Sequence, residues 1–339
     1  MKIYNLAFLL LFLFPFACNE ALEFPQSSHL PDSQQKQKRD KAGAAIIVFK
    51  SADGGQTWQN ISKGLPVPVQ DEYDVRRDVF FANDNGLYLT VGNGIYHNKP
   101  NATAPFWTKE IFPDEHSNIT PGKTGIFAYN YYNGQLFQTI NGTSVWSPVF
   151  TNFQEKKIRT VFETTGGTVF IDTDKGLFKS TNSGNTWKQV NAGGWGMKLV
   201  ESNGVLMAAS PRGIIRSTDD GENWELVISE GGVGIVAERI EGGFAAINYN
   251  TASKTRRVRT SYDGGKTWQP IDAGLPAQLS IASIIQVGQY FFCGHPTGIF
   301  RSSDKGKTWK LLLPSIKNKV FNLSVSGNVI YAIPRSGGC

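Results

Sequence analysis

Basic side chains and one tryptophan are the residues of this chain that best suit ligand binding. Five basic residues fall on or beside short apolar segments expected to be strands, and they are Arg76, Arg77, Arg159, Lys198 and Arg239. Cations gathered at one mouth of a fold would hold an anionic ligand through charge-assisted hydrogen bonds. Trp195 lies in the glycine-rich run 193–196, where an exposed indole would stack on a sugar or contact a protein. The alternatives are solvated charges at strand ends and an indole packed against the fold.

Acidic residues raise a second possibility, the hydrolysis of a glycosidic bond. Glycosidases use two carboxyl groups that flank the scissile bond. The candidates are Asp71, Glu72, Asp74 and Glu238, but nothing in their spacing pairs them. The four histidines lack metal-ligand spacing, and no phosphate-binding or dinucleotide-binding glycine motif occurs. We therefore expect neither a metal nor a cofactor.

Five octapeptides share Ser at position 1, Asp or Asn at 3, Gly at 5 and Trp at 8. They comprise Ser51, Asp53, Gly55 and Trp58; Ser180, Asn182, Gly184 and Trp187; Ser217, Asp219, Gly221 and Trp224; Ser261, Asp263, Gly265 and Trp268; and Ser302, Asp304, Gly306 and Trp309. The Asp or Asn can fold back onto backbone amides, and the Gly tolerates positive φ. The Trp can pack between neighbouring sheets. We expect structural hairpins, because carboxylates found once per repeat cannot converge on one ion.

The repeat predicts the architecture. Two degenerate copies end at Trp107 and Trp146, and the seven Trp positions are then 37–49 residues apart, which is the length of a four-stranded propeller blade. The mature chain starts with a third strand, at 45–50, and ends with a first and a second strand, at 320–325 and 329–333. We predict an all-β, seven-bladed β-propeller in which N-terminal strands 3 and 4 pair with C-terminal strands 1 and 2. That pairing would close the ring and remove exposed sheet edges.

The octapeptides resemble the Asp box, or BNR repeat, of sialidases and related propellers. Sialidases have six blades and an early Arg-Ile-Pro motif that this chain lacks. Xyloglucan-cleaving glycosidases pair two seven-bladed propellers, whereas this chain has the length of one. The resemblance in size and layout is greatest to the photosystem II assembly-factor propellers, and it covers nearly the whole mature chain through repeat motifs only. That resemblance implies a non-catalytic binding or scaffold protein.

The N-terminal residues are typical of an export signal. Residues 1–17 combine Lys2 with an apolar core at 6–14, too short to span a bilayer. Ala17 and Cys18 resemble a bacterial lipoprotein cleavage site, which would make Cys18 the lipidated residue; the alternative is an ordinary secretory signal. Residues 18–43 would be a flexible tether, and 44–339 the propeller. We expect a membrane-anchored protein of the cell envelope, periplasmic or on the cell surface, or else a secreted one.

Composition narrows the partner. The 339 residues are 40% hydrophobic and 18% charged, as in a globular domain, and the net charge is +6. This mild basic bias favours an anionic protein or glycan, and no basic block predicts binding to nucleic acid. Two functions follow: a non-catalytic propeller that binds such a ligand through a basic loop face, or a glycoside hydrolase acting on extracellular glycans. Whether Cys293 and Cys339 pair is left open.

Overall fold

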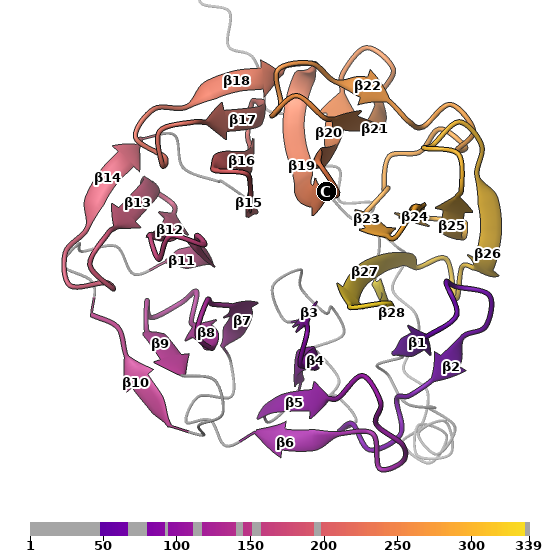
Figure 1. Cartoon of the computed structure of the whole chain (residues 1–339), viewed down its shortest axis with the longest axis horizontal. Coiled ribbons are helices and arrows are strands. Elements are labelled where there is room, and N and C mark those ends of the chain that lie inside the picture. Colours follow the sequence, from indigo (N-terminus) through magenta and orange to yellow (C-terminus); the bar gives the residue numbers. More distant parts are fainter. Residues whose placement is uncertain are drawn as a thin grey trace, which may run out of the picture. The chain divides into compact units, whose positions relative to one another are not determined.

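The fold was obtained as a computed structural model that describes residues 48–66, 80–91, 94–110, 117–139, 145–150, 157–192 and 198–335. Residues 44–339 form one compact unit. Its described residues contain strands and no helix, and they build seven four-stranded antiparallel sheets arranged as blades around a ring (Figure 1). The predicted all-β, seven-bladed propeller is confirmed.

The two inner strands of each blade carry most of the buried side chains. The first strands, nearest the centre, are β3 (Phe80–Asn83), β7 (Asn118–Pro121), β11 (Ile158–Glu163), β15 (Leu199–Ser202), β19 (Gly231–Ile240), β23 (Ser283–Val287) and β27 (Val320–Ser326). The second strands are β4 (Gly86–Val91), β8 (Ile126–Tyr129), β12 (Val169–Thr173), β16 (Val205–Ser210), β20 (Gly243–Asn250), β24 (Tyr290–His295) and β28 (Val329–Arg335). Apolar side chains on both faces of these strands follow from their position between two neighbouring blades.

The two outer strands of each blade are joined by the Asp boxes or their degenerate copies. The third strands are β1 (Phe49–Ser51), β5 (Gly94–Asn98), β9 (Leu136–Thr139), β13 (Gly176–Ser180), β17 (Gly213–Ser217), β21 (Thr255–Ser261) and β25 (Gly298–Ser302). The fourth strands, outermost in Figure 1, are β2 (Gln59–Asn60), β6 (Thr108–Glu110), β10 (Trp146–Pro148), β14 (Lys188–Asn191), β18 (Glu225–Ile228), β22 (Gln269–Pro270) and β26 (Lys310–Pro314).

The strand order divides the connections between two faces of the ring. Each blade is a meander of four antiparallel strands, so the turns between strands 1 and 2 share a face with the boxes between strands 3 and 4. We call this the Asp-box face. The turns between strands 2 and 3 and the connections between blades share the opposite face, which we call the loop face.

One blade contains both ends of the propeller. Its strand order is β2-β1-β28-β27, and β1 pairs with β28 through Phe49 opposite Ala332, Lys50 opposite Tyr331 and Ser51 opposite Ile330. Strands from the beginning and the end of the propeller therefore share one sheet. Backbone hydrogen bonds within this one blade therefore join the first described strands of the propeller to the last.

The hydrophobic core lies between neighbouring blades rather than inside any one of them. One cluster joins Val236 of β19 and Ile247 of β20 to Ile284 of β23 and Phe291 of β24, all at most 4% exposed. The box tryptophans pack at the outer ends of such clusters: Trp309, half-buried, packs against this one. The prediction that these indoles pack between sheets is confirmed.

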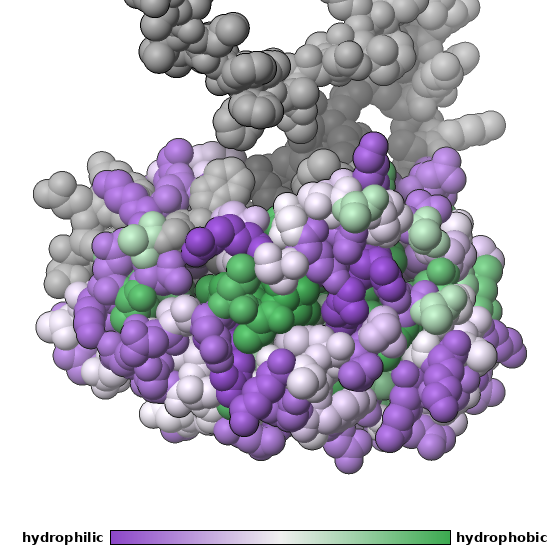
Figure 2. Space-filling view, turned by 90° about the horizontal axis from the view of Figure 1, so that it is seen from above, coloured by the Kyte–Doolittle hydropathy of each residue, from purple (hydrophilic) through white to green (hydrophobic). Residues whose placement is uncertain are grey.

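The rim of the ring is mixed in character. Figure 2 views it from the side of β18 and β22, where apolar residues gather in one patch with hydrophilic residues around it. Among the outermost strands, Leu226 of β18 is 43% exposed and Leu311 of β26 is 42% exposed. Fourth strands have no outer neighbour, so some of their apolar side chains remain in contact with solvent.

Candidate functional site

The Asp boxes have the hydrogen bonds of a closed turn. In the first box the hydroxyl of Ser51 donates to Asp53 Oδ1 at 2.8 Å and accepts from the backbone N–H of Gly55 at 2.9 Å. Asp53 Oδ1 also accepts the backbone N–H of Thr57 at 2.9 Å. Trp58 donates its Nε1–H back to the carbonyl of Gly55 at 3.0 Å. Each polar side chain of the box thus has its partner inside the same turn.

These bonds also fix the charge of the box carboxylates. Hydrogen bonds from the hydroxyl and the backbone N–H of Thr57 lower the pKa of Asp53 to about 2. Hydrogen bonds from the backbone and side-chain N–H groups of Asn223 lower the pKa of Asp219 to about 2. Hydrogen bonds from the hydroxyl and the backbone N–H of Thr308 lower the pKa of Asp304 to about 2. A carboxylate kept ionised by its own turn is a structural acceptor. It is poorly suited to proton transfer near neutral pH.

A cluster of aromatic and charged side chains lies on the loop face where two blades meet. We call Tyr131, Tyr132, Lys157, Arg159 and Asp174 the tyrosine–arginine cluster. Tyr131 and Tyr132 belong to the turn between β8 and β9, while Arg159 is the second residue of β11 and Asp174 lies in the turn between β12 and β13. The cluster therefore joins the second–third strand turns of neighbouring blades.

In this cluster the Tyr132 ring is exposed, whereas the Tyr131 ring contacts two cations. The Arg159 guanidinium carbon lies 5.3 Å from the Tyr131 ring centroid, and Lys157 Nζ lies 5.8 Å from it. The two tyrosine rings meet edge-on with centroids 5.2 Å apart, and Tyr132 is 64% exposed. The backbone N–H of Tyr132 donates to Asn130 Oδ1 at 2.8 Å, which fixes the turn. Cations over one face of Tyr131 are a favourable cation–π arrangement.

Asp174 holds the basic side chains of this cluster in place. Arg159 donates Nε–H to Asp174 Oδ1 at 2.5 Å, and Lys157 Nζ lies 3.5 Å from Asp174 Oδ2. Two cations and one carboxylate leave the cluster with a formal charge of +1. Such a site would favour an anionic group beside an exposed aromatic ring.

Other carboxylates of the ring are also paired with cations. Asp272, in the connection from β22 to β23, accepts from Arg257 at 2.7 and 3.0 Å. Glu230, in the connection from β18 to β19, pairs with Arg259. Glu238, a candidate acid from the sequence, pairs with Lys198, which was predicted to bind a ligand. These ion pairs join neighbouring strands and occupy the carboxylates.

The predicted binding residues are not all at one mouth of the ring. Arg159 lies near the start of its first strand, on the loop face, and Lys198 directly precedes β15. Arg239 is the second-last residue of β19, toward the Asp-box face, where its side chain is exposed. Described first strands thus carry basic residues at opposite ends, so the structure separates Arg159 from Arg239.

Several predicted positions lie outside the described residues. These are Arg76, Arg77 and Trp195, the candidate acids Asp71, Glu72 and Asp74, the expected signal and lipidation site at Cys18, and Cys339. Cys293 is described and has a free, fully buried thiol whose pKa is raised by burial. Such a thiol behaves as a small apolar core group.

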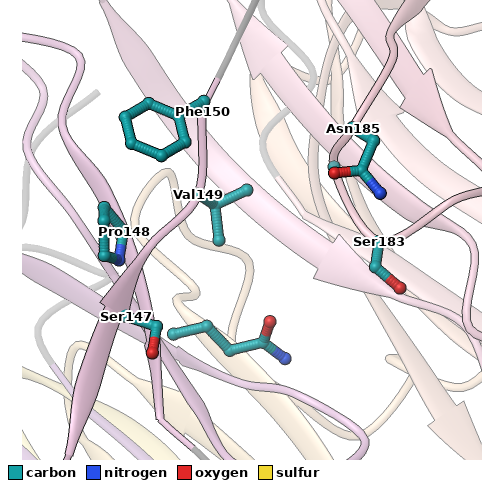
Figure 3. A pocket seen from close by; sticks show the side chains of 8 residues that line it. Ser147, Pro148, Val149, Phe150, Ser183 and Asn185 are labelled. Carbon is teal, nitrogen blue, oxygen red and sulfur yellow. The ribbon is translucent and has the colours of Figure 1, made fainter.

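A cavity of about 270 Å³ lies where β10 ends beside the box of the next blade (Figure 3). Pro148 and Val149 form an apolar wall, and Ser183 and Asn185 of the box line the other side. The ring of Phe150, 79% exposed, lies at its edge. Residues 151–156, which follow Phe150, lie outside the described part of the chain. The described lining residues carry no charged side chain, so they do not define the kind of ligand that would bind.

The described residues offer neither a metal centre nor a membrane-spanning helix. No group of three or more His, Cys, Asp or Glu there could hold a metal ion. No helix in the same part of the chain is long and apolar enough to cross a membrane.

Sequence reasoning missed the two tyrosines of the cluster. Tyr131 and Tyr132 lie in one blade and Arg159 begins the next, and only the assembled ring brings them together. The available signal was the run Asn130-Tyr131-Tyr132-Asn133-Gly134, in which polar turn residues flank two aromatic ones. Aromatic side chains in a turn are exposed unless a neighbouring element covers them.

Comparison with known proteins agrees with this fold. A model of the BNR/Asp-box repeat matches residues 259–270, which contain the fourth box. The chain is a seven-bladed propeller with Asp-box repeats. No curated protein matches its sequence.

Solved structures with the same architecture include binding proteins and enzymes. YCF48 bound to D1 peptide is 15% identical, with a TM-score of 0.52 and 87% of each chain covered. The GH74 xyloglucanase from Xanthomonas campestris is 12% identical, with a TM-score of 0.60, and the match covers 83% of this chain and 54% of that one. An ancestral GH74 enzyme is 16% identical, with a TM-score of 0.54 and coverage of 75% and 43%. The chain thus spans about half the length of the two GH74 enzymes, and these likenesses establish the fold alone.

Proposed function

We propose that this Asp-box propeller is a non-catalytic binding protein that recognises an anionic ligand, a glycan or a protein, through its loop face. The observation that carries the proposal is the tyrosine–arginine cluster. It combines a tyrosine ring that is 64% exposed with two cations beside the neighbouring ring. The proposal includes export to the cell envelope and lipidation at Cys18, as the N-terminal sequence predicts.

The cluster suits an acidic sugar in particular. An exposed aromatic ring can pack on the apolar face of a sugar, and Lys157, with a side chain 53% exposed, can meet a carboxylate or sulfate on it. Arg159 is held by Asp174 and by its contact with Tyr131. Its guanidinium therefore contributes a positive charge at a fixed position. An acidic peptide offers the same charge without the flat apolar face.

Hydrolysis of glycans is the alternative that the sequence raised. It needs two carboxyl groups facing a bound sugar, one of them able to give up a proton near neutral pH. The described carboxylates Asp174, Glu230 and Asp272 are each paired with an arginine. A bound sugar would therefore have to displace an arginine before it could contact any of these carboxylates. This supports binding over catalysis on the described part of the loop face.

A glycan array with the purified protein tests the proposal, read for both binding and product release. We expect binding to uronate-containing or sulfated glycans that weakens as salt is raised, without cleavage. Tyr132→Ala should reduce affinity roughly tenfold, because it removes the exposed ring. Tyr262→Ala is the matched control, since Tyr262 is 52% exposed but lies in an Asp box on the opposite face.

Two outcomes would contradict this proposal, and a third would decide between its two kinds of ligand. Release of a cleaved product would make the protein a glycosidase. Equal losses of affinity in both tyrosine variants would remove the loop face as the site. If no glycan binds on the array but an acidic protein is captured in a salt-sensitive way that depends on Tyr132, the same site binds a protein and not a glycan.

A further inference from the structure

A hydrogen bond between neighbouring blades recurs on the Asp-box face near the centre of the ring. In each case the turn between strands 1 and 2 of one blade donates a backbone N–H to a side-chain oxygen near the end of the next blade's first strand. The pairs are Lys123 to Glu163 Oε2 at 2.6 Å, Thr165 to Glu201 Oε2 at 2.7 Å, and Glu241 to Gln286 Oε1 at 2.8 Å. A carboxylate or carboxamide oxygen thus caps the turn of its neighbour.

Arg239 breaks this series. In their own blades Glu201 pairs with Leu206, Arg239 with Phe244 and Gln286 with Phe291, so the three occupy one register position next to the turn. Arginine has five N–H donors and no acceptor. At the boundary where it stands in place of the acceptor, a donor faces a donor.

The turn that faces Arg239 is Asn203-Gly204, between β15 and β16. Asn203 has a φ of 52° and Gly204 a φ of 73°, the two positive φ values of a type I′ hairpin turn. Among the residues that the structure describes, the Asn203 N–H has no acceptor and the Arg239 guanidinium has no carboxylate partner. Two sets of donors therefore lie at one place without the oxygen that the neighbouring boundaries provide.

A cavity of about 500 Å³ lies there. Ser202, Asn203, Arg239 and Gln286 line it, together with Glu241 and the glycines of the two flanking turns. It opens to solvent and is lined by three neighbouring blades. Gln286 is already engaged, because its oxygen accepts from Glu241 and its Nε2–H donates to Gly288 at 2.8 Å. The remaining donors of the cavity point to an anion.

We propose that this notch is a second ligand site, which binds a carboxylate between the Arg239 guanidinium and the Asn203 turn. The chemical class follows from the chain itself, because Glu163 and Glu201 fill the equivalent places with carboxylates. Arginine binds a carboxylate through two parallel hydrogen bonds, and the Asn203 N–H, which has no acceptor among the described residues, would add a third. The site is independent of the tyrosine–arginine cluster, which lies on the opposite face.

The Arg239→Glu variant separates this proposal from a general charge effect. A glutamate at this position restores the acceptor that Glu201 supplies one blade earlier, so the variant should be at least as heat-stable as the parent protein while losing the site. Arg212→Glu is the matched control. Arg212 is an exposed arginine in the turn between β16 and β17, on the loop face, and the charge change is the same.

The measurement is the thermal midpoint of the full-length protein titrated with glucuronate, with glucose as the neutral probe at equal concentrations and constant ionic strength. All proteins in this titration carry Tyr132→Ala, which weakens binding at the tyrosine–arginine cluster. In that background we expect glucuronate to raise the midpoint of the otherwise unchanged protein and of Arg212→Glu, and to leave Arg239→Glu unchanged; glucose should act on none of them. In the parent protein the ¹⁵N–¹H signal of Asn203 should shift on titration.

Other results would overturn the proposal. If the glucuronate shift is retained in Arg239→Glu, the shift does not come from this notch. If the shift is lost equally in Arg212→Glu, it depends only on the net charge of the protein. No effect in the otherwise unchanged protein, or an unmoved Asn203 signal, would mean that the notch holds no carboxylate. A marked loss of stability in Arg239→Glu would contradict the equivalence with Glu201. Glu241→Gln removes the nearest negative charge, so weaker rather than equal or stronger binding in that variant would also contradict the geometry.

Discussion

At the scale of single residues, the box serine is as important as the more conspicuous aspartate. Ser217 is 2% exposed, donates to Asp219 Oδ1 at 2.8 Å and accepts the backbone N–H of Gly221 at 2.9 Å. The aspartate lies outside, among solvated turn residues. The serine is the member of the box that satisfies a buried donor, and buried donors are costly to leave without a partner.

Ser217→Ala is therefore expected to destabilise the protein by about 1–3 kcal/mol, because the Gly221 N–H loses its buried acceptor. Thr218→Ala, one residue further along the same box and exposed, should change stability by less than about 0.5 kcal/mol. The measurement is the free energy of unfolding from urea titrations of both variants. Similar values for the two would mean that water replaces the serine hydroxyl.

Asp219→Asn should in contrast be nearly neutral at pH 7. The second box already has an asparagine at this place, and Asn182 Oδ1 accepts the backbone N–H of Thr186 at 2.9 Å, as the aspartates do. Asp219→Ala removes that acceptor and should lower the thermal midpoint. If the asparagine and alanine variants melted together, the turn hydrogen bond would not be what the residue contributes.

At the scale of elements, neighbouring blades are locked by a basic residue that directly precedes the box serine. Arg216 donates Nε–H to the carbonyl of Gly264 at 2.6 Å, and Arg301 donates to that of Gly54 at 2.9 Å. Lys179 bonds to Asp220 at 2.9 Å and to Glu222 at 3.0 Å. In all three the partner lies in the box loop of the following blade. The third strand of one blade thus holds the hairpin of the next.

Arg301→Met tests this lock at the ring closure, because Gly54 belongs to the blade that contains both ends of the propeller. The arginine also lies 4.9 Å from the Tyr290 ring centroid. Loss of a charged donor should cost about 1.5–3 kcal/mol. Lys310→Met, on the exposed outer strand of the same blade, is the control. Equal unfolding free energies for the two variants would show that the Gly54 carbonyl is satisfied by water instead.

The sequence predicts the strands and blades better than it predicts the residues of the candidate site. The tryptophan spacing and the box pattern predict blades because each depends on residues that are close in the chain. The tyrosine–arginine cluster depends on which blades touch, so Tyr131 beside Arg159 follows only from the assembled ring. The role of Arg239 depends on strand register, since a shift of one residue would turn its side chain to the other face of the sheet.

At the scale of the whole molecule, the connections between blades are tied to the sheets by a few buried polar groups. His295, at the end of β24, is fully buried. Its Nδ1 accepts the backbone N–H of Thr297 at 3.1 Å, so Nε2 is the protonated nitrogen and donates to the carbonyl of Pro276 at 2.9 Å. Pro276 lies in the connection from β22 to β23. The neutral ring thereby joins one blade to the loop that enters it.

This histidine predicts how the stability of the ring depends on pH. Burial lowers the pKa of His295 below its ordinary value of 6.5, so below about pH 6.5 the unfolded chain binds a proton that the folded protein resists. Stability should be constant with respect to this group above pH 6.5 and fall as the pH drops below it. The box aspartates act later, because the pKa of Asp53 falls from 3.8 to about 2 on folding, and their contribution is lost only as the pH drops from about 4 toward 2.

His295→Gln separates the two regimes. The variant should be less stable at pH 8, since the bonds to Thr297 and Pro276 are disturbed, yet its unfolding free energy should change less than that of the parent protein between pH 6.5 and 5. Below pH 4 both proteins should lose stability together, because the boxes are unchanged. Urea titrations at pH 8, 6.5, 5 and 3.5 measure this. Parallel curves across the range from 6.5 to 5 would mean that His295 takes up its proton without opening the loop, and that another group sets the acid response of the ring.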